Sequence, residues 1–169
     1  AFKYDLKRFL EYQKHMIEKL QVEVHLSTEA TPEMIRESDF DAVLAAVGSQ
    51  AFLPPVPGID GKHVMIAEEC YDKMDALGER IVIIGGGEIG CETALALKEA
   101  GKFVTIIEML PELAPETFHL TRDIMLWRVS KEVTAYTGAT CKEIAENSVR
   151  FLDKNGTEQS IPADHVIIS

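Results

Sequence analysis

The chain has 169 residues, of which 46% are hydrophobic, and this is enough for a packed core of one large domain or of one and a half small ones. Its formal net charge of −11, from 28 acidic and 17 basic residues without a basic cluster, argues against a nucleic-acid partner. No apolar run approaches the ~20 residues of a membrane span, the charged start lacks a signal-peptide core and the three cysteines form no C-x-x-C motif, so we expect no membrane partner and a reduced, cytoplasmic setting.

The first sixty residues carry the patterns of two helices, two strands and a connector. Apolar residues first recur at helical spacing with charged residues between them, which is typical of an amphipathic helix. Thr31 and Pro32 are an N-cap and a first-turn proline, and they indicate a second, short helix. Three prolines then exclude a regular element. The expected elements are a helix over 6–20, a strand over 22–26, a helix over 33–37, a strand over 40–47 and an extended connector over 51–58.

A glycine-rich turn after a buried strand is the strongest pattern in the chain. The run from Ile81 to Ile84 is apolar, β-branched and bounded by glycine, as a buried parallel strand should be. Gly85, Gly87 and Gly90 follow at the spacing G-x-G-x-x-G. The first glycine permits a tight turn, the second lets a pyrophosphate approach the backbone, and the third lets the next helix pack on the strand. A merely structural turn would gain nothing from three glycines, so the pattern predicts a dinucleotide site.

An acidic residue completes this unit. Glu108 ends the strand expected over 103–107, where a carboxylate can accept hydrogen bonds from the ribose hydroxyls of an adenine dinucleotide. The alternative is an ordinary solvated carboxylate at a strand end. Because a carboxylate would repel a 2′-phosphate and no arginine lies nearby in sequence, we expect the site to bind NAD(H) in preference to NADP(H).

The rest of the chain predicts further strands and helices of an α/β fold. The Asn155-Gly156 pair indicates a hairpin within an antiparallel meander. The five histidines share no ligand spacing, so no metal site is expected. The expected elements are a strand over 63–66, helices over 68–75, 92–100 and 120–129, a strand over 133–136, a meander over 141–145, 149–153 and 158–161, and a buried strand over 166–168.

The order of these parts resembles that of the two-dinucleotide-fold flavoprotein reductases. More closely, it resembles the C-terminal half of the old-yellow-enzyme-like NADH:flavin oxidoreductases, the group of 2,4-dienoyl-CoA reductase, NADH oxidase and clostridial enoate reductases. The match is carried by GGGEIGCETALAL (85–97), VTIIEMLPELAP (104–115), FDAVLAAVGSQAFLPPVPGIDG (40–61) and the ending NSVRFLDKNGTEQSIPADHVIIS (147–169).

This resemblance implies a fold, a domain division and a set of site residues. The fold is a Rossmann-like three-layer nicotinamide-nucleotide domain with a small antiparallel meander, over 67–169 with its core at 80–169, preceded by a partial FAD-binding domain and connector over 1–66. Glu92 would lie near the nicotinamide and the flavin, and Val47 stands where the family usually has threonine. No residue is expected to act as acid, base or nucleophile. The expected cofactor-binding residues are Gly85, Gly86, Gly87, Glu88, Ile89, Gly90, Glu92, Glu108, Val47 and Gly48.

The resemblance also implies a function for a longer parent protein. Residues 1–79 lack the separate glycine turn that holds the flavin pyrophosphate in this family, so the chain resembles an excised piece. Its partners would be the nicotinamide dinucleotide and the parent's remaining FAD and barrel domains. The parent would pass hydride from NADH to FAD and, through an iron–sulfur cluster and FMN, to an enoyl-type or related acceptor. Two alternatives stay open: a piece of a disulfide or ferredoxin-type reductase, and a non-catalytic nucleotide-binding module.

Overall fold

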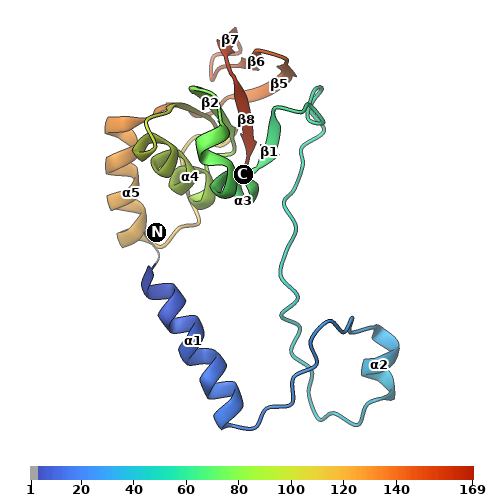
Figure 1. Cartoon of the computed structure of the whole chain (residues 1–169). Helices are drawn as coiled ribbons and strands as arrows, with labels where there is room; N and C mark the ends of the chain where they lie inside the picture. The colour runs from blue at the N-terminus through green and yellow to red at the C-terminus, as the bar shows by residue number, and fades with distance from the viewer. Residues whose placement is uncertain (1–3) are drawn as a thin grey trace. The chain divides into compact units, whose positions relative to one another are not determined.

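The computed structural model describes residues 4–169, which divide into two compact units between Gly48 and Ser49 (Figure 1). The first unit holds helix α1, Tyr4–Lys19, and helix α2, Pro32–Glu37, which confirms both predicted helices. Thr31 is the N-cap of α2, because its Oγ1 accepts a hydrogen bond from the Met34 N–H at 3.3 Å.

The two strands predicted in the first unit, over 22–26 and 40–47, are wrong. Neither segment has regular secondary structure, and their large apolar side chains are exposed, including Val24 at 52% and Leu44 at 95%. A strand is stabilised by ladder hydrogen bonds to a neighbour and by burial of one face. The described residues of the first unit include no other strand, so the alternating pattern has nothing to pair with.

The second unit is built on a five-stranded parallel sheet in the order β1-β8-β2-β3-β4. The predicted glycine unit is confirmed in its secondary structure: a strand, a helix from the glycine turn and a second strand follow one another. All five predicted strands of this sheet are present to within two residues at either end. The strands are β1 (Val64–Ile66), β2 (Arg80–Ile84), β3 (Phe103–Ile107), β4 (Thr134–Tyr136) and β8 (His165–Ile168).

Alternate residues of the central strand face two different layers. Ile81 and Ile83 of β2 pack in a core with the helices, whereas Val82 packs in a second core with the meander, where Phe151 is completely buried. Figure 1 shows the helices grouped on one side and the meander apart from them. The layers are formed by α3 (Ala67–Lys73), the short 3-10 turn η1 (Met74–Ala76), α4 (Glu88–Glu99) and α5 (His119–Glu132), and by β5 (Thr140–Ala145), β6 (Ser148–Leu152) and β7 (Glu158–Pro162). Within residues 4–169, no helix is both long enough and apolar enough to cross a bilayer.

The end of the proline connector is docked onto the meander. Val56 and Ile59 pack in the second core, and the Ile144 N–H donates to the Pro57 carbonyl at 2.8 Å. The connector has no regular element, as its prolines predict. It therefore belongs to the second compact unit, while the assignment of residues 1–66 to a flavin domain stays a prediction.

An ion pair ties β2 to β8 at the amino ends of these strands. Asp164 Oδ2 accepts from the Arg80 backbone N–H at 2.8 Å, and Oδ1 accepts from Arg80 Nε at 3.1 Å and from Arg80 Nη2. The hydrogen bond from the Arg80 side chain, followed by that from its backbone, lowers the pKa of Asp164 from 3.8 to about 2. Because the pKa of Asp164 is lower in the folded chain than in the unfolded chain, its ionised form stabilises the fold at pH values above the unfolded pKa. This stabilisation is lost as the pH falls toward 2.

We expect Asp164→Asn to lower the thermal unfolding midpoint at about pH 6, because the variant loses the charged partner of Arg80. The gap between variant and wild type should close as the pH falls from about 4 to about 2, where Asp164 itself becomes protonated. Thermal melts followed by circular dichroism across this range measure the gap. The exposed Asp72→Asn is the control, and a gap that persists unchanged at the lowest pH would contradict the assignment.

Candidate functional site

Three strands bring their carboxyl ends together at the site. β2 lies between β3 and β8, so the chain leaves β2 toward one side of the sheet and returns on the other side. In open parallel sheets, ligands bind at this switch point, outside the carboxyl ends of the strands. The residues that follow the three strands are Gly85, Glu108 and Ser169. The predicted glycine turn therefore meets the predicted acidic residue at one edge.

The first and third glycines of the motif are required by packing. Gly85 has φ +108°, and a Cβ added there would lie 2.1 Å from the backbone oxygen of Ser169. A Cβ added at Gly90 would lie 2.2 Å from the Gly85 carbonyl oxygen. Any side chain at either position would force the turn away from β8 or α4 away from the turn.

The second glycine of the motif is not required by packing. Gly87 is the exposed N-cap of α4 with φ −66°, and a Cβ added there would meet no described atom within 4 Å. Its open side lies at the amino end of α4, where the first-turn N–H groups have no acceptor within the helix and the helix dipole favours an anion. This is the geometry that a pyrophosphate needs to approach the backbone.

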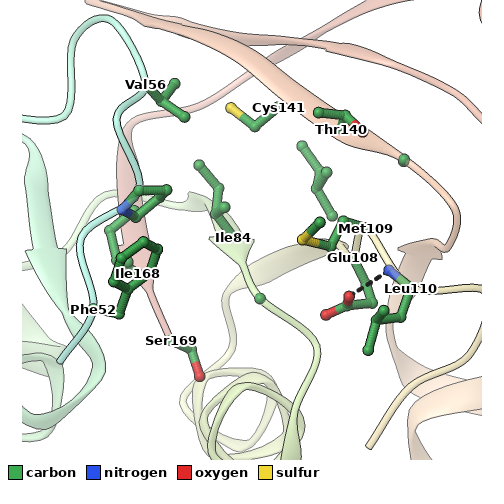
Figure 2. Close-up of a pocket in the computed structure, with 14 residues that line it drawn as sticks. Phe52, Val56, Ile84, Glu108, Met109, Leu110, Thr140, Cys141, Ile168 and Ser169 are labelled. Carbon is green, nitrogen blue, oxygen red and sulfur yellow. Dashed lines mark hydrogen bonds between the residues drawn. The ribbon is translucent and has the colours of Figure 1, made fainter.

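Glu108 has partners in the structure that the sequence pattern does not reveal. Its side chain is buried, with 7% exposed, and Oε2 accepts from the Gly86 N–H at 2.6 Å. Oε1 accepts from the Leu110 N–H at 2.6 Å, the bond drawn in Figure 2. The alternative of an ordinary solvated carboxylate is therefore wrong. Each carboxylate oxygen has a second acceptor direction, so these bonds leave capacity for ribose hydroxyls.

An apolar hollow of about 360 Å³ lies beside Glu108. Figure 2 shows its lining side chains converging from the connector, from the ends of β2, β3 and β8, and from β5. Burial raises the pKa of the Cys141 thiol to about 11, so Cys141 is an apolar part of the wall and not a nucleophile. The main apolar lining residues are Phe52, Val56, Ile84, Met109, Cys141 and Ile168. A small, mostly apolar hollow with a few polar side chains, here Glu108, Thr140 and Ser169, suits a flat heteroaromatic base.

A second hollow, of about 510 Å³, lies on the other side of the glycine turn. It is lined by Gly87, Glu88 and Ile89 and by the loop after β3, and Leu110 and Ser169 line both hollows. The Thr117 hydroxyl donates to Glu88 Oε2 at 3.5 Å, across the second hollow. The two hollows therefore flank the turn, in the arrangement that an elongated ligand crossing Gly87 would need.

The structure brings most of the predicted site residues together, but not all. Residues 85–90 and Glu108 lie together, and Glu92 is an exposed residue on the second turn of α4, whose neighbours Cys91 and Thr93 are buried. Val47 and Gly48 belong to the first unit, where Val47 is 91% exposed and Gly48 has φ +75°. Their contact with a flavin stays a prediction.

Sequence reasoning missed the walls of the hollows and the loop that holds the turn. Phe52 and Cys141 lie far from the glycine motif in sequence, and no local pattern marks either as part of the site. Ala114 donates its N–H to the Gly86 carbonyl at 2.8 Å, and the prolines on both sides of it indicate only a loop. Only the family-like segment over 104–115 could have pointed to this loop.

Comparison with known proteins gives the family of the chain. The family model described as pyridine nucleotide-disulphide oxidoreductase matches residues 4–169. Bilirubin reductase of Mediterraneibacter gnavus is 32% identical over 99% of this chain, and cinnamate reductase of Clostridium sporogenes is 34% identical over 99%. The chain covers 26% and 25% of these two proteins, so it spans about a quarter of the length of the curated relatives it matches.

Solved structures agree with this assignment. The structure of a 2-naphthoyl-CoA reductase complex matches 98% of this chain at a TM-score of 0.81 and 29% identity, with 25% of that chain covered. Thioredoxin reductase of T. acidophilum matches 72% of this chain at a TM-score of 0.62 and 27% identity, with 41% of that chain covered. The predicted Rossmann-like α/β fold with a separate antiparallel sheet is confirmed. The chain belongs to the pyridine nucleotide-disulphide oxidoreductase family, whose members are flavin-dependent enzymes that use a nicotinamide nucleotide.

Proposed function

We propose that this chain binds NAD(H) across the glycine turn and, in its parent enzyme, presents the nicotinamide to FAD for hydride transfer. The observation that carries this proposal is the open side of Gly87. No packing contact explains the missing side chain there, and the position lies at the amino end of α4, where it lines the second hollow while Gly85 lines the first. A pyrophosphate at Gly87 with a nucleoside on either side accounts for all three features.

Each half of the dinucleotide has a hollow of suitable chemistry. The apolar hollow beside Met109 and Cys141 suits the adenine, with its ribose hydroxyls at the carboxylate of Glu108. The hollow lined by Glu88 and Ile89 suits the nicotinamide riboside. Glu92, one turn further along α4, is proposed to lie toward the nicotinamide and the flavin.

The charge at the adenosine side favours NAD(H) over NADP(H). Glu108 is buried and tied to two backbone N–H groups, so its carboxylate cannot swing away from a 2′-phosphate. The negative charge of Glu108 would repel the negative charge of a 2′-phosphate on the adjoining ribose. We therefore propose NAD(H) as the ligand, with NADP(H) bound more weakly.

The residues of the site orient the cofactor and do no covalent chemistry themselves. When bound, the nicotinamide supplies the hydride and the flavin accepts it. Burial, with a smaller contribution from Glu108, raises the pKa of the Cys91 thiol to about 11, so this cysteine at the start of α4 is not a thiolate nucleophile. The contribution of the chain is to hold the pyrophosphate and both nucleosides in a fixed geometry and to limit water at the turn.

For the parent enzyme, we propose the old-yellow-enzyme-like reductase organisation and an enoyl-type or related acceptor. The share of the chain that each relative matches supports this proposal. Cinnamate reductase and the 2-naphthoyl-CoA reductase structure match nearly the whole chain, whereas the persulfide and thioredoxin reductase structures match 72% of it. In this organisation residues 1–66, with Val47 and Gly48, belong to the FAD domain, residues 67–169 form the nicotinamide domain, and a barrel domain carries FMN and an iron–sulfur cluster. A disulfide reductase parent is the second candidate, favoured by a dihydrolipoyl dehydrogenase that is 31% identical over 75% of the chain.

Titration of the chain with NADH, NADPH and FAD tests the proposed ligand. We expect NADH to bind, NADPH to bind at least about tenfold more weakly because of Glu108, and FAD not to bind tightly. Isothermal calorimetry, with the fluorescence of the single tryptophan, Trp127, as a second signal, measures each Kd. The chain alone should not reduce an enoyl substrate. Absence of NADH binding, or turnover without the parent's other domains, would overturn the proposal.

Two glycine variants separate binding from packing. We expect Gly87→Ala to fold with a wild-type melting temperature but to bind NADH about tenfold more weakly, because the new Cβ occupies the space left for the pyrophosphate. Gly90→Ala should instead lose about 1–3 kcal/mol of folding stability, because its Cβ would clash with the Gly85 carbonyl. Thermal melts and NADH titration of both variants give the comparison. Equal effects of the two substitutions on NADH affinity and stability would contradict this division.

Glu108→Gln tests the choice between NADH and NADPH. The amide keeps one acceptor oxygen but loses the charge, so the preference for NADH should fall several-fold as NADPH binding improves relative to NADH. The ratio of the two Kd values is the measurement, and it is independent of a general loss of stability. Asp123→Asn, which removes an exposed carboxylate on α5 that lines neither hollow, is the control. An unchanged ratio in Glu108→Gln would remove this carboxylate from the ribose site.

A further inference from the structure

The loop between β3 and α5, residues 108–118, holds the second residue of the glycine turn from both sides. The Gly86 N–H donates to Glu108 Oε2 at 2.6 Å, and the Gly86 carbonyl accepts from the Ala114 N–H at 2.8 Å. A Cβ added at Gly86 would lie 2.4 Å from Leu113 Cδ2, so the loop lies directly against the turn. The loop therefore sets the orientation of both peptide groups that flank Gly86, the second of which is shared with Gly87.

The loop reaches Gly86 only through an unfavourable backbone conformation. Ala114 has φ +48°, in the left-handed region that residues with a Cβ rarely adopt, and it is 1% exposed. A conformation of this kind persists only where surrounding contacts hold it in place. Ala114 is held by its hydrogen bond to Gly86 and, within the loop, by the Thr117 N–H, which donates to its carbonyl at 3.2 Å; neither bond ties it to a helix.

Arg122, in the first turns of α5, ties the loop to that helix. Its Nε donates to the Ala114 carbonyl at 2.9 Å and to the Leu113 carbonyl at 3.1 Å, and its Nη2 donates to Leu113 at 2.8 Å and to Glu112 Oε2 at 2.7 Å. The side chain is only 23% exposed. The planar, multidonor guanidinium suits two adjacent carbonyl oxygens, which a single ammonium group matches less well.

We propose that Arg122 is a positioning residue of the dinucleotide site, acting through Leu113 and Ala114 on Gly86. It also fixes the loop wall that both hollows share at Leu110 and that continues in the second hollow through Ala114. This inference rests on the proposed function, since the turn that Arg122 orients is the proposed pyrophosphate site. Without Arg122, Ala114 can leave the left-handed region and release the Gly86 carbonyl. The peptide group between Gly86 and Gly87 can then rotate, which misaligns the backbone groups that meet the ligand.

Arg128, further along the same helix, provides a matched comparison. It is also a partly buried arginine, with 34% of its side chain exposed, and it pairs with Glu99 at 3.0 Å and Glu132 at 3.2 Å. These two carboxylates lie at the ends of α4 and α5, away from the loop over 108–118. A general contribution of an α5 arginine to stability would be shared by Arg122 and Arg128, whereas a positioning effect belongs to Arg122 alone.

The test compares Arg122→Gln, Arg122→Lys and Arg128→Gln with the wild type in the complete 169-residue chain. NADH affinity by calorimetry, the melting temperature, and amide hydrogen exchange at Ala114 without ligand are measured for each. We expect Arg122→Gln to bind NADH about tenfold more weakly, equivalent to about 1.4 kcal/mol, and to exchange the Ala114 amide faster. Arg122→Lys should be intermediate in both, and Arg128→Gln should match the wild type in both whatever its melting temperature.

Each outcome decides the proposal. Wild-type affinity and wild-type Ala114 protection in Arg122→Gln would overturn it, as would full restoration by Arg122→Lys, which would show that charge alone suffices. If Arg122→Gln does not fold, the same two measurements on Arg122→Lys, which keeps the charge and the alkyl stem, decide the question. A wild-type chain that does not bind NADH would refute the proposed function instead, and Ala114 exchange would still decide whether Arg122 holds the loop.

Discussion

The hydrogen bond from the Gly86 N–H to Glu108 is the contact on which the rest of the site depends. A buried backbone N–H needs an acceptor, and the tight turn directs this one away from its own strand and helix. The carboxylate at the end of the neighbouring strand meets that need. It thereby joins the glycine turn to β3, places the charge beside the apolar hollow and starts the loop that carries Ala114 back to Gly86.

The glycines of the motif divide into two kinds once their surroundings are known. Gly85 and Gly90 are glycines because other backbone atoms occupy the space of a side chain, and they make the turn possible. Gly87 is a glycine although its surroundings are open, and the pyrophosphate proposed to lie there gives a reason that packing does not. The same spacing thus combines a structural requirement with a binding requirement, and only the second bears on function.

The glycine unit and its loop form a connected support for one ligand geometry. Glu108 accepts from the Gly86 N–H, Ala114 donates to the Gly86 carbonyl, and Arg122 donates to the carbonyl of Ala114 from the next helix. Under the proposed function, the chemistry of hydride transfer belongs to nicotinamide and flavin, and the chain supplies that geometry. A rigid turn between two hollows is a sufficient structural contribution.

The strands of the parallel sheet and the glycine turn could be predicted from the sequence, because local periodicity and spacing encode them, and the broad reductase family was indicated by resemblance. Local pattern was not sufficient in the first unit, where the strands predicted over 22–26 and 40–47 do not form without a neighbouring strand. The partners of Glu108, the two hollows and the hydrogen bonds of Arg122 became known only from the folded chain. These depend on residues that are far apart in the chain and meet only in the folded structure, such as Phe52 and Cys141, which line the same hollow, and no local signal specifies such a meeting.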